Sequence, residues 1–288
     1  MALLATRTWG QGGGGRPLAL LVHGITSSSR TWWRLGPALA ERGYEVLAVD
    51  LRGHGGSPRS EHGLGPADLA ADVAETVAVH LDASRSDGDA ATPVDLLVGH
   101  SLGALVSLAL LASRPRFARR LLLEDPPGPL GIDWAELAAG IEYDADRAHR
   151  DPAALKADLE RENPSWPAGE AEQRVADMAD CDAAAIAAAV RSGIPFDLAG
   201  LAAAIQLPVL LVLADEAAGS SLVGADRADL VSAVRQGTVR VLPAGHSVHR
   251  EALDAYLLAV DEWLAAVPGW DAVSRPRRRR AGRRPPRA

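Results

Sequence analysis

The most constraining feature of this sequence is the GHSLG motif at residues 99–103, which joins two apolar stretches. The stretch before it, residues 94–98, has the length and branched composition of a buried strand, and residues 101–113 have those of a buried helix. A strand that turns into a helix around a serine flanked by glycines holds that serine on a strained, tight turn. The motif therefore predicts a parallel sheet with Ser101 presented at its carboxyl edge.

Apolar runs of strand length alternate with stretches of helical length along most of the chain, a pattern typical of a parallel sheet with crossover helices. Strands are expected at residues 17–22, 44–49, 94–98, 120–123, 208–213 and 238–242. Between residues 127 and 200 helical segments are separated by proline or glycine, with no convincing strand. We therefore expect an α/β fold with a mostly parallel central sheet flanked by helices. Its core comprises residues 1–126 and 201–267, and residues 127–200 form an inserted helical cap.

Charge is distributed unevenly along the chain. The formal net charge is −7, yet residues 274–288 contain eight arginines and no acid, which leaves 22 basic against 37 acidic residues elsewhere. The proline- and arginine-rich composition predicts a disordered tail at residues 268–288. The acidic body disfavours nucleic acid as a partner of the folded domain. A solvated tail is the simpler interpretation, and a tail that contacts nucleic acid or a membrane surface is the alternative.

Cysteine content and hydropathy limit the classes of protein to which this sequence can belong. Cys181 is the single cysteine of the sequence, which excludes an intrachain disulfide and a cysteine metal cluster. The sequence shows no secretory signal and no uncharged apolar stretch of eighteen residues. We expect a cytoplasmic protein that acts on a small molecule, with no membrane partner, no metal and no cofactor.

A serine hydroxyl becomes a useful nucleophile only when a base removes its proton. Among eight histidines, His246 lies between the last expected strand and the final helix, so its loop returns to the sheet edge that holds Ser101. His249, three residues later, is the alternative and is expected to begin the last helix. The sequence therefore predicts His246 as the base.

A carboxylate is then needed to orient the imidazole and stabilise its protonated form. Asp215 directly follows the strand at residues 208–213, and the order serine, aspartate, histidine matches the order that accompanies this kind of turn. Asp125, at the end of the strand at residues 120–123, and Glu216 are the alternatives. We predict Asp215 as the acid.

An oxyanion formed by attack on a carbonyl requires nearby N–H donors. The backbone amide of Leu102 follows the nucleophile, and the amide of Ile25 lies in the loop after the strand at residues 17–22. Gly24 permits the close backbone approach that such a donor needs. We predict Ile25 and Leu102 as the oxyanion donors.

Substrate contacts are expected from large side chains in the cap and the loops above Ser101. The candidates are Trp32, Trp134 and Trp166. A helical cap of this size indicates a small to medium, partly apolar substrate.

Several separate segments, taken together, resemble one known family. LLVHGITSSSRTWW, VDLRGHGGS, GHSLG, LLVLADE and LPAGHSVHRE occur in that order. They are similar to segments of the α/β-hydrolase-fold superfamily, in its serine-nucleophile, esterase- and lactonase-like branch with a helical cap. The resemblance implies a hydrolase that cleaves an ester, lactone or related acyl bond through a Ser-His-Asp triad and an acyl-enzyme. A cofactor-free perhydrolase or haloperoxidase, and a ligand receptor on the same fold, are the alternatives.

Overall fold

The computed structural model describes residues 2–10, 15–60, 64–83, 94–128, 133–193 and 197–267. The tail expected at residues 268–288 lies outside the described residues. Across the described part of the chain, no helix is long and apolar enough to cross a membrane.

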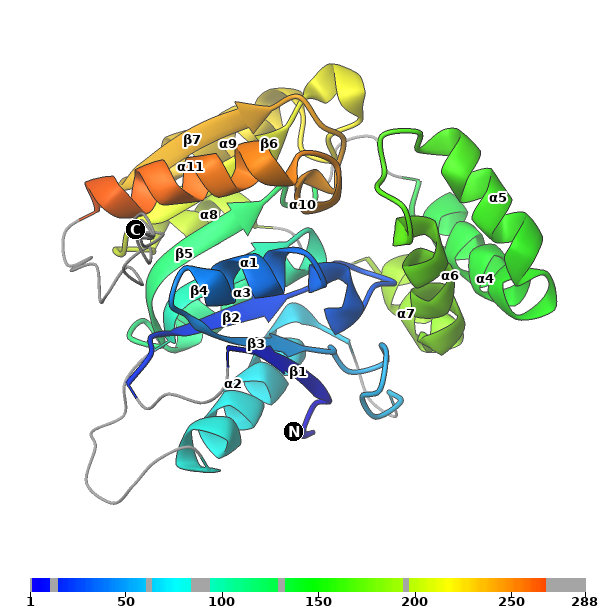
Figure 1. Ribbon diagram of the computed structural model, residues 1–288, viewed down its shortest axis with the longest axis horizontal. Coiled ribbons are helices and arrows are strands. Elements are labelled where there is room, and N and C mark those ends of the chain that lie inside the picture. The colour runs from blue at the N-terminus through cyan, green and yellow to red at the C-terminus, as the bar shows by residue number, and fades with distance from the viewer. Residues whose placement is uncertain are drawn as a thin grey trace, which may run out of the picture.

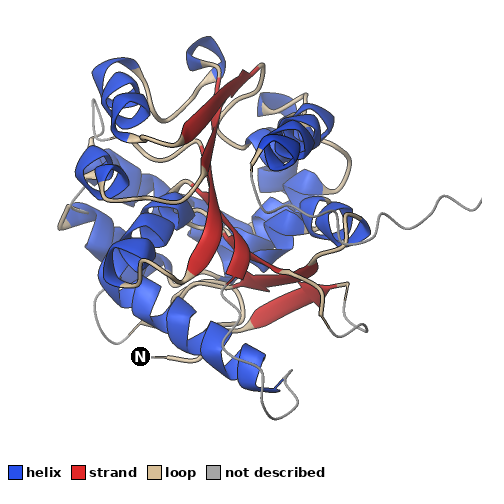
Figure 2. Cartoon of the chain, turned by 90° about the vertical axis from the view of Figure 1, so that its left-hand side faces the viewer, coloured by secondary structure: helices blue, strands red, loops and turns tan. Residues whose placement is uncertain are grey.

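Seven strands form one twisted sheet, which Figure 2 shows between two layers of helices. The strand order is β1-β3-β2-β4-β5-β6-β7, with β1 antiparallel to β3 and every other pair parallel. This arrangement confirms the predicted α/β fold class. The strands are β1 (Thr6–Trp9), β2 (Leu18–Val22), β3 (Glu45–Val49), β4 (Val94–His100), β5 (Ala118–Glu124), β6 (Val209–Ala214) and β7 (Gly237–Leu242).

The central strands are buried on both faces, which explains their continuous apolar runs. Alternate side chains contribute to two separate cores. One core lies between the sheet and α2 (Pro66–Ala83), α3 (Leu102–Ser113), α8 (Leu198–Ala203) and α9 (Gly224–Ala233). The other lies between the sheet and α1 (Leu35–Glu41) and α11 (Leu253–Ala266). Burial of both cores fixes the strand register, because a slip of one residue would exchange the two faces.

Four helices between β5 and α8 lie together at one side of the molecule, beside α10 (Val248–Glu251) (Figure 1). They are α4 (Trp134–Arg150), α5 (Pro152–Glu162), α6 (Glu170–Asp180) and α7 (Ala183–Arg191). Proline begins α5 and glycine directly precedes α6, as expected, but neither residue type lies between α6 and α7. Asp133, Asp151 and Asp182 accept hydrogen bonds from the first backbone amides of α4, α5 and α7.

The segment after β2 contains two short helices. It forms a short 3-10 helix (Ser29–Trp32) and then α1. Ser28 caps the short helix, and Asp50 accepts a hydrogen bond from the Ser29 amide. These contacts fix the loop between β2 and α1 at the carboxyl edge of the sheet.

Candidate active site

Ser101 lies between β4 and α3 with φ 52° and ψ −119°, a left-handed conformation that is strained for a serine. The flanking glycines make this turn possible. A Cβ on Gly99 would lie 2.4 Å from the Gly103 carbonyl oxygen, and a Cβ on Gly103 would lie 2.1 Å from the Val22 carbonyl oxygen. The Ser101 side chain does not cap α3. Strand and helix therefore pack without space for side chains, and the hydroxyl is left for another role.

Two cavities meet at Ser101. One, of about 310 Å³, is lined mainly by α4, α6 and the loop after β2. The other, of about 460 Å³, is lined by Leu102, Trp134 and Val190 among others, and is largely apolar. Both are bounded by Ser101, His246 and Ile25. The structure thus brings the predicted nucleophile, the predicted base and the predicted oxyanion loop to one place.

The loop that contains Ile25 approaches Ser101 closely. A Cβ on Gly24 would lie 3.0 Å from Ser101 Cβ and 2.9 Å from His100 Nδ1, so only glycine fits without a shift. Thr26 has φ 52°, and the Arg174 guanidinium donates to both its carbonyl oxygen and its hydroxyl. Leu102 is the first residue of α3, so its N–H has no acceptor within the helix.

His246 lies in the loop between β7 and α10, with about a third of its side chain exposed. Its Nδ1 is 2.7 Å from Asp125 Oδ2 and 2.9 Å from the hydroxyl of Ser221. Since a carboxylate only accepts hydrogen bonds, Nδ1 carries the proton and Nε2 is left with its lone pair. That tautomer is the one a general base needs.

Asp125 takes the place that the sequence assigned to Asp215. It directly follows β5, has φ 35°, and its side chain is fully buried. Besides His246, its carboxylate accepts hydrogen bonds from the Ala214 amide, the Ser220 hydroxyl and the Ser221 amide. Burial acts to raise the pKa of Asp125, but the hydrogen bonds from His246, Ser220 and Ser221 outweigh it and lower the pKa. The carboxylate is therefore held in its charged form.

The prediction that Asp215 holds His246 is contradicted by these contacts. Asp215 caps the three-residue 3-10 helix (Glu216–Ala218) and accepts a hydrogen bond from the Ala217 amide at 2.9 Å. Glu216, the other alternative, forms an ion pair with Arg227 at 3.2 Å. The loop after β6 folds back so that Ser221 reaches His246 and Ser220 reaches Asp125.

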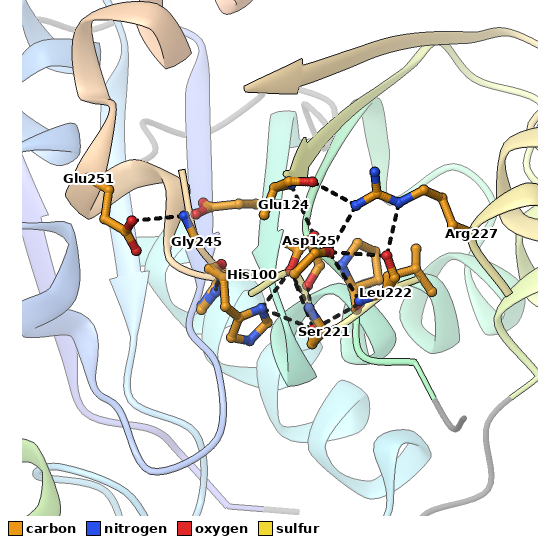
Figure 3. A network of polar contacts seen from close by, with 12 residues as sticks. His100, Glu124, Asp125, Ser221, Leu222, Arg227, Gly245 and Glu251 are labelled. Carbon is orange, nitrogen blue, oxygen red and sulfur yellow. Dashed lines mark hydrogen bonds and ion pairs between the residues drawn. The ribbon is translucent and has the colours of Figure 1, made fainter. Parts of the chain in front are cut away.

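Ser220, Ser221 and Arg227 were not identified from the sequence. Arg227 donates to the carbonyl oxygens of Ala214 and Leu222 and to the Ser220 hydroxyl, which holds the loop against Asp125 (Figure 3). The adjacent serines of this loop are ordinary turn residues, so their spacing carries no signal of this contact.

A second histidine–carboxylate pair lies beneath the first. His249 donates its backbone amide and its Nδ1–H to Glu124 Oε1, at 2.9 and 2.7 Å. Burial lowers the pKa of His249 well below its usual value and also lowers that of His100. His249 is 2% exposed and lines neither cavity described above, so the structure contradicts the alternative that made it the base.

His100 lies between the two histidines of this loop, with ring centroids 4.7 Å from His246 and 5.2 Å from His249. Its Nε2 donates to the His246 carbonyl oxygen at 3.0 Å. His100, Glu124 and His249 place ligand-type atoms within 4.8 Å of one another. His100 Nε2 and both ring nitrogens of His249 are engaged in hydrogen bonds within the protein, so the cluster supports the loop that holds His246.

The structure places the three tryptophans that were predicted to contact substrate in different environments. Trp134 lines the apolar cavity and Trp166 lines the other cavity, where its ring lies 5.4 Å from the Arg250 guanidinium carbon. Trp32 is completely buried, with its ring 4.4 Å from that of His249. The expectation that Trp32 contacts substrate is therefore contradicted, because its side chain belongs to the core under α1.

Comparisons with known proteins agree with this geometry. Residues 19–260 match the model of the alpha/beta hydrolase family. Lipase LipV of Mycobacterium tuberculosis is 34% identical over 148 residues, 51% of each chain, so the chain matches about half the length of that relative. RutD of Variovorax paradoxus, whose name assigns it to carbamate hydrolysis, is 31% identical over 80% of this chain and 84% of its own.

A solved structure of E-2-(acetamidomethylene)succinate hydrolase superposes with a TM-score of 0.69 and 26% identity, covering 91% of this chain and 99% of that one. The matches named here are all to hydrolases. The fold, the serine turn and the family match together place this chain in the α/β-hydrolase family, as a hydrolytic enzyme.

Proposed function

We propose that this enzyme hydrolyses an ester, lactone or related acyl bond of a small to medium substrate, through Ser101, His246 and Asp125. The observation that carries the proposal is the hydrogen bond between Asp125 and His246 Nδ1, beside a serine that is held at a strained turn on the same cavity. Nucleophile, base and orienting acid are the three parts that serine acyl transfer requires.

The proposed reaction has two steps. Ser101 Oγ attacks the substrate carbonyl carbon while its proton passes to His246 Nε2. The Ile25 and Leu102 amides donate to the oxyanion, and the intermediate collapses when His246 protonates the leaving group. Water then attacks the acyl-enzyme, gives its proton to His246, and releases the acid as the Ser101 hydroxyl is restored.

Helices α4 to α7 serve as the cap in this proposal, within the segment of residues 127–200. Trp134 and Trp166 line different cavities, so they are proposed to contact different parts of the substrate. Cavities of about 310 and 460 Å³ fit a small molecule and do not fit a polymer.

The test is labelling and turnover with matched variants. A fluorophosphonate should label Ser101 in the wild-type enzyme, and the enzyme should hydrolyse p-nitrophenyl butyrate. Ser101→Ala should remove both, whereas Ser113→Ala, at the far end of α3, should leave both unchanged. A folded wild-type protein with neither labelling nor Ser101-dependent turnover would contradict the proposal and favour a ligand receptor. Peroxide-dependent activity without hydrolysis would favour a perhydrolase.

A further inference from the structure

The 310 Å³ cavity next to Ser101 contains two arginines that the proposed acyl transfer does not use. Arg174 comes from α6 and Arg250 from α10. Asp144 is the other charged residue in the lining of this cavity, so the lining contains two cations and one anion. Ser101 lines the same cavity as both guanidinium groups, and buried cations are costly unless they have partners.

Arg174 has no carboxylate partner within ion-pair distance in the part of the chain that the structure describes. Its two terminal nitrogens donate to Thr26, and its Nε has no such bond. Burial, together with the charge of Arg250, lowers the pKa of Arg174 to about 10, which still leaves it protonated at neutral pH. Arg174 is half-buried beside a second cation, so it gains more than a fully exposed cation from an incoming anion.

Arg250 is 6% exposed and rigidly held. Its Nε lies 3.0 Å from Glu170 Oε1 and 3.0 Å from the Thr31 hydroxyl, and its Nη2 also donates to Thr31. Thr31 in turn lies 2.7 Å from His249 Nε2, so the Glu124–His249 pair fixes the arginine through one hydroxyl. None of these bonds involves Nη1. This nitrogen of the fixed guanidinium therefore remains as a donor.

Asp144 is the one acid among the residues that line this cavity, and Glu170, outside the lining, pairs with Arg250. It is half-buried, and burial raises its pKa even though Arg174 acts to lower it. It forms no ion pair with either arginine across the described residues. The wall is therefore open for an anion that binds the guanidinium groups directly.

We propose that the substrate carries a carboxylate that binds Arg174 and Arg250 while its acyl carbon lies at Ser101. The apolar cavity lined by Trp134, Val190 and Pro127 then receives the uncharged part of the molecule. Guanidinium groups suit this task because their planar donors match a carboxylate in geometry and charge. This inference rests on the proposed function and names its substrate class.

The experiment compares two pairs of esters that differ only by a carboxylate. Mono-p-nitrophenyl glutarate against p-nitrophenyl butyrate places the charge on the acyl side, and 4-carboxyphenyl butyrate against phenyl butyrate places it on the leaving group. The wild-type kcat/KM should favour the anionic member of one pair by at least tenfold, and that pair identifies the side of the scissile bond. Preference for the neutral member of both pairs would overturn the inference.

Variants of Arg174 separate binding from support of the loop. Arg174→Met also removes the contact with Thr26, so activity on both esters should fall. If Arg174 binds the carboxylate, kcat/KM for the anionic ester should fall roughly 10- to 100-fold further than for its neutral partner. Arg174→Lys should restore part of that ratio. Arg150→Gln, on an exposed arginine of α4 paired with Asp146, should leave the ratio unchanged. Equal losses for both esters in Arg174→Met would overturn the inference.

Binding to Ser101→Ala provides a measurement without turnover. Glutarate should bind this variant in calorimetry, and Arg174→Met on the same background should weaken binding by a similar factor. Absence of glutarate binding, or binding that Arg174→Met leaves unchanged, would count against the carboxylate site alone. Fluorophosphonate labelling of wild-type Ser101 tests the proposed acyl chemistry separately, so the two failures are distinguishable.

Discussion

Replacing Asp125 with asparagine should lower kcat/KM for p-nitrophenyl butyrate by about 10⁴-fold. Asp125 Oδ2 lies 2.7 Å from His246 Nδ1, and the carboxylate is fully buried. At an effective dielectric of about 20, a carboxylate and an imidazolium at this separation attract each other by about 6 kcal/mol. Since each 1.36 kcal/mol is a factor of ten in rate, losing that attraction when His246 becomes protonated corresponds to about four orders of magnitude.

Asp215→Asn is the matched control for this measurement. The Asp215 carboxylate only caps the short helix after β6, and asparagine caps helices as well as aspartate does. Its kcat/KM should stay within about twofold of wild type. Circular dichroism and the thermal midpoint of each variant show whether the fold is kept. A thousandfold loss in Asp215→Asn, with a folded Asp125→Asn enzyme near wild-type activity, would refute the assignment of the acid.

Three further predictions test other parts of the structure. Gly103→Ala should lower the free energy of unfolding in denaturant by more than about 3 kcal/mol, because the new Cβ would overlap a β2 carbonyl oxygen. The control Gly140→Ala, in α4, should be neutral or stabilising by about 0.5 kcal/mol. Equal changes in the two variants would contradict the packing described for Gly103. Ser221→Ala should reduce kcat by no more than about tenfold, measured with the same ester, because Asp125 still holds His246. Burial lowers the pKa of His54 to about 3, so the unfolded chain binds this proton first as pH drops below about 6.5. His54 alone should then lower the free energy of unfolding by about 1.4 kcal/mol per pH unit, in addition to the contributions of His100 and His249. His54→Asn should flatten this dependence in denaturant titrations at pH 7.5 and 5.0, and a slope equal to that of wild type would show that His54 does not contribute.

Much of the fold was predictable because its signals are local. The apolar runs of β2, β4 and β6 are buried on both faces, so composition alone marks them as strands. Ser101 was predictable for a related reason, since glycines on either side of a serine are needed wherever strand and helix meet this closely. His246 followed from the chain order of the last strand and the last helix.

The carboxylate that orients His246 was not predictable from chain order, because an aspartate directly follows each of two neighbouring strands. Asp125 and Asp215 follow β5 and β6, which pair directly, so both carboxylates lie near the same sheet edge. The choice depends on the direction of one side chain after a left-handed residue and on how the loop after β6 folds back. Neither property is a pattern in sequence. Trp32 was misjudged for a similar reason, since tryptophans in a core and at a cavity look alike in a sequence.

The two arginines of the cavity belong to parts of the chain that differ in how far a substitution would disturb the catalytic residues. Arg250 is adjacent to His249 and four residues from His246, and it is tied through Thr31 to the end of β5. A change there would disturb the base as well. Arg174 belongs to the cap helix α6, which also supplies the ion-pair partner of Arg250, Glu170, and holds Thr26 of the loop after β2. A redesign of acid selectivity in α6 therefore has to keep a donor to Thr26 at residue 174 and a partner for Arg250 at residue 170, because the same helix supports both the cavity and the oxyanion loop.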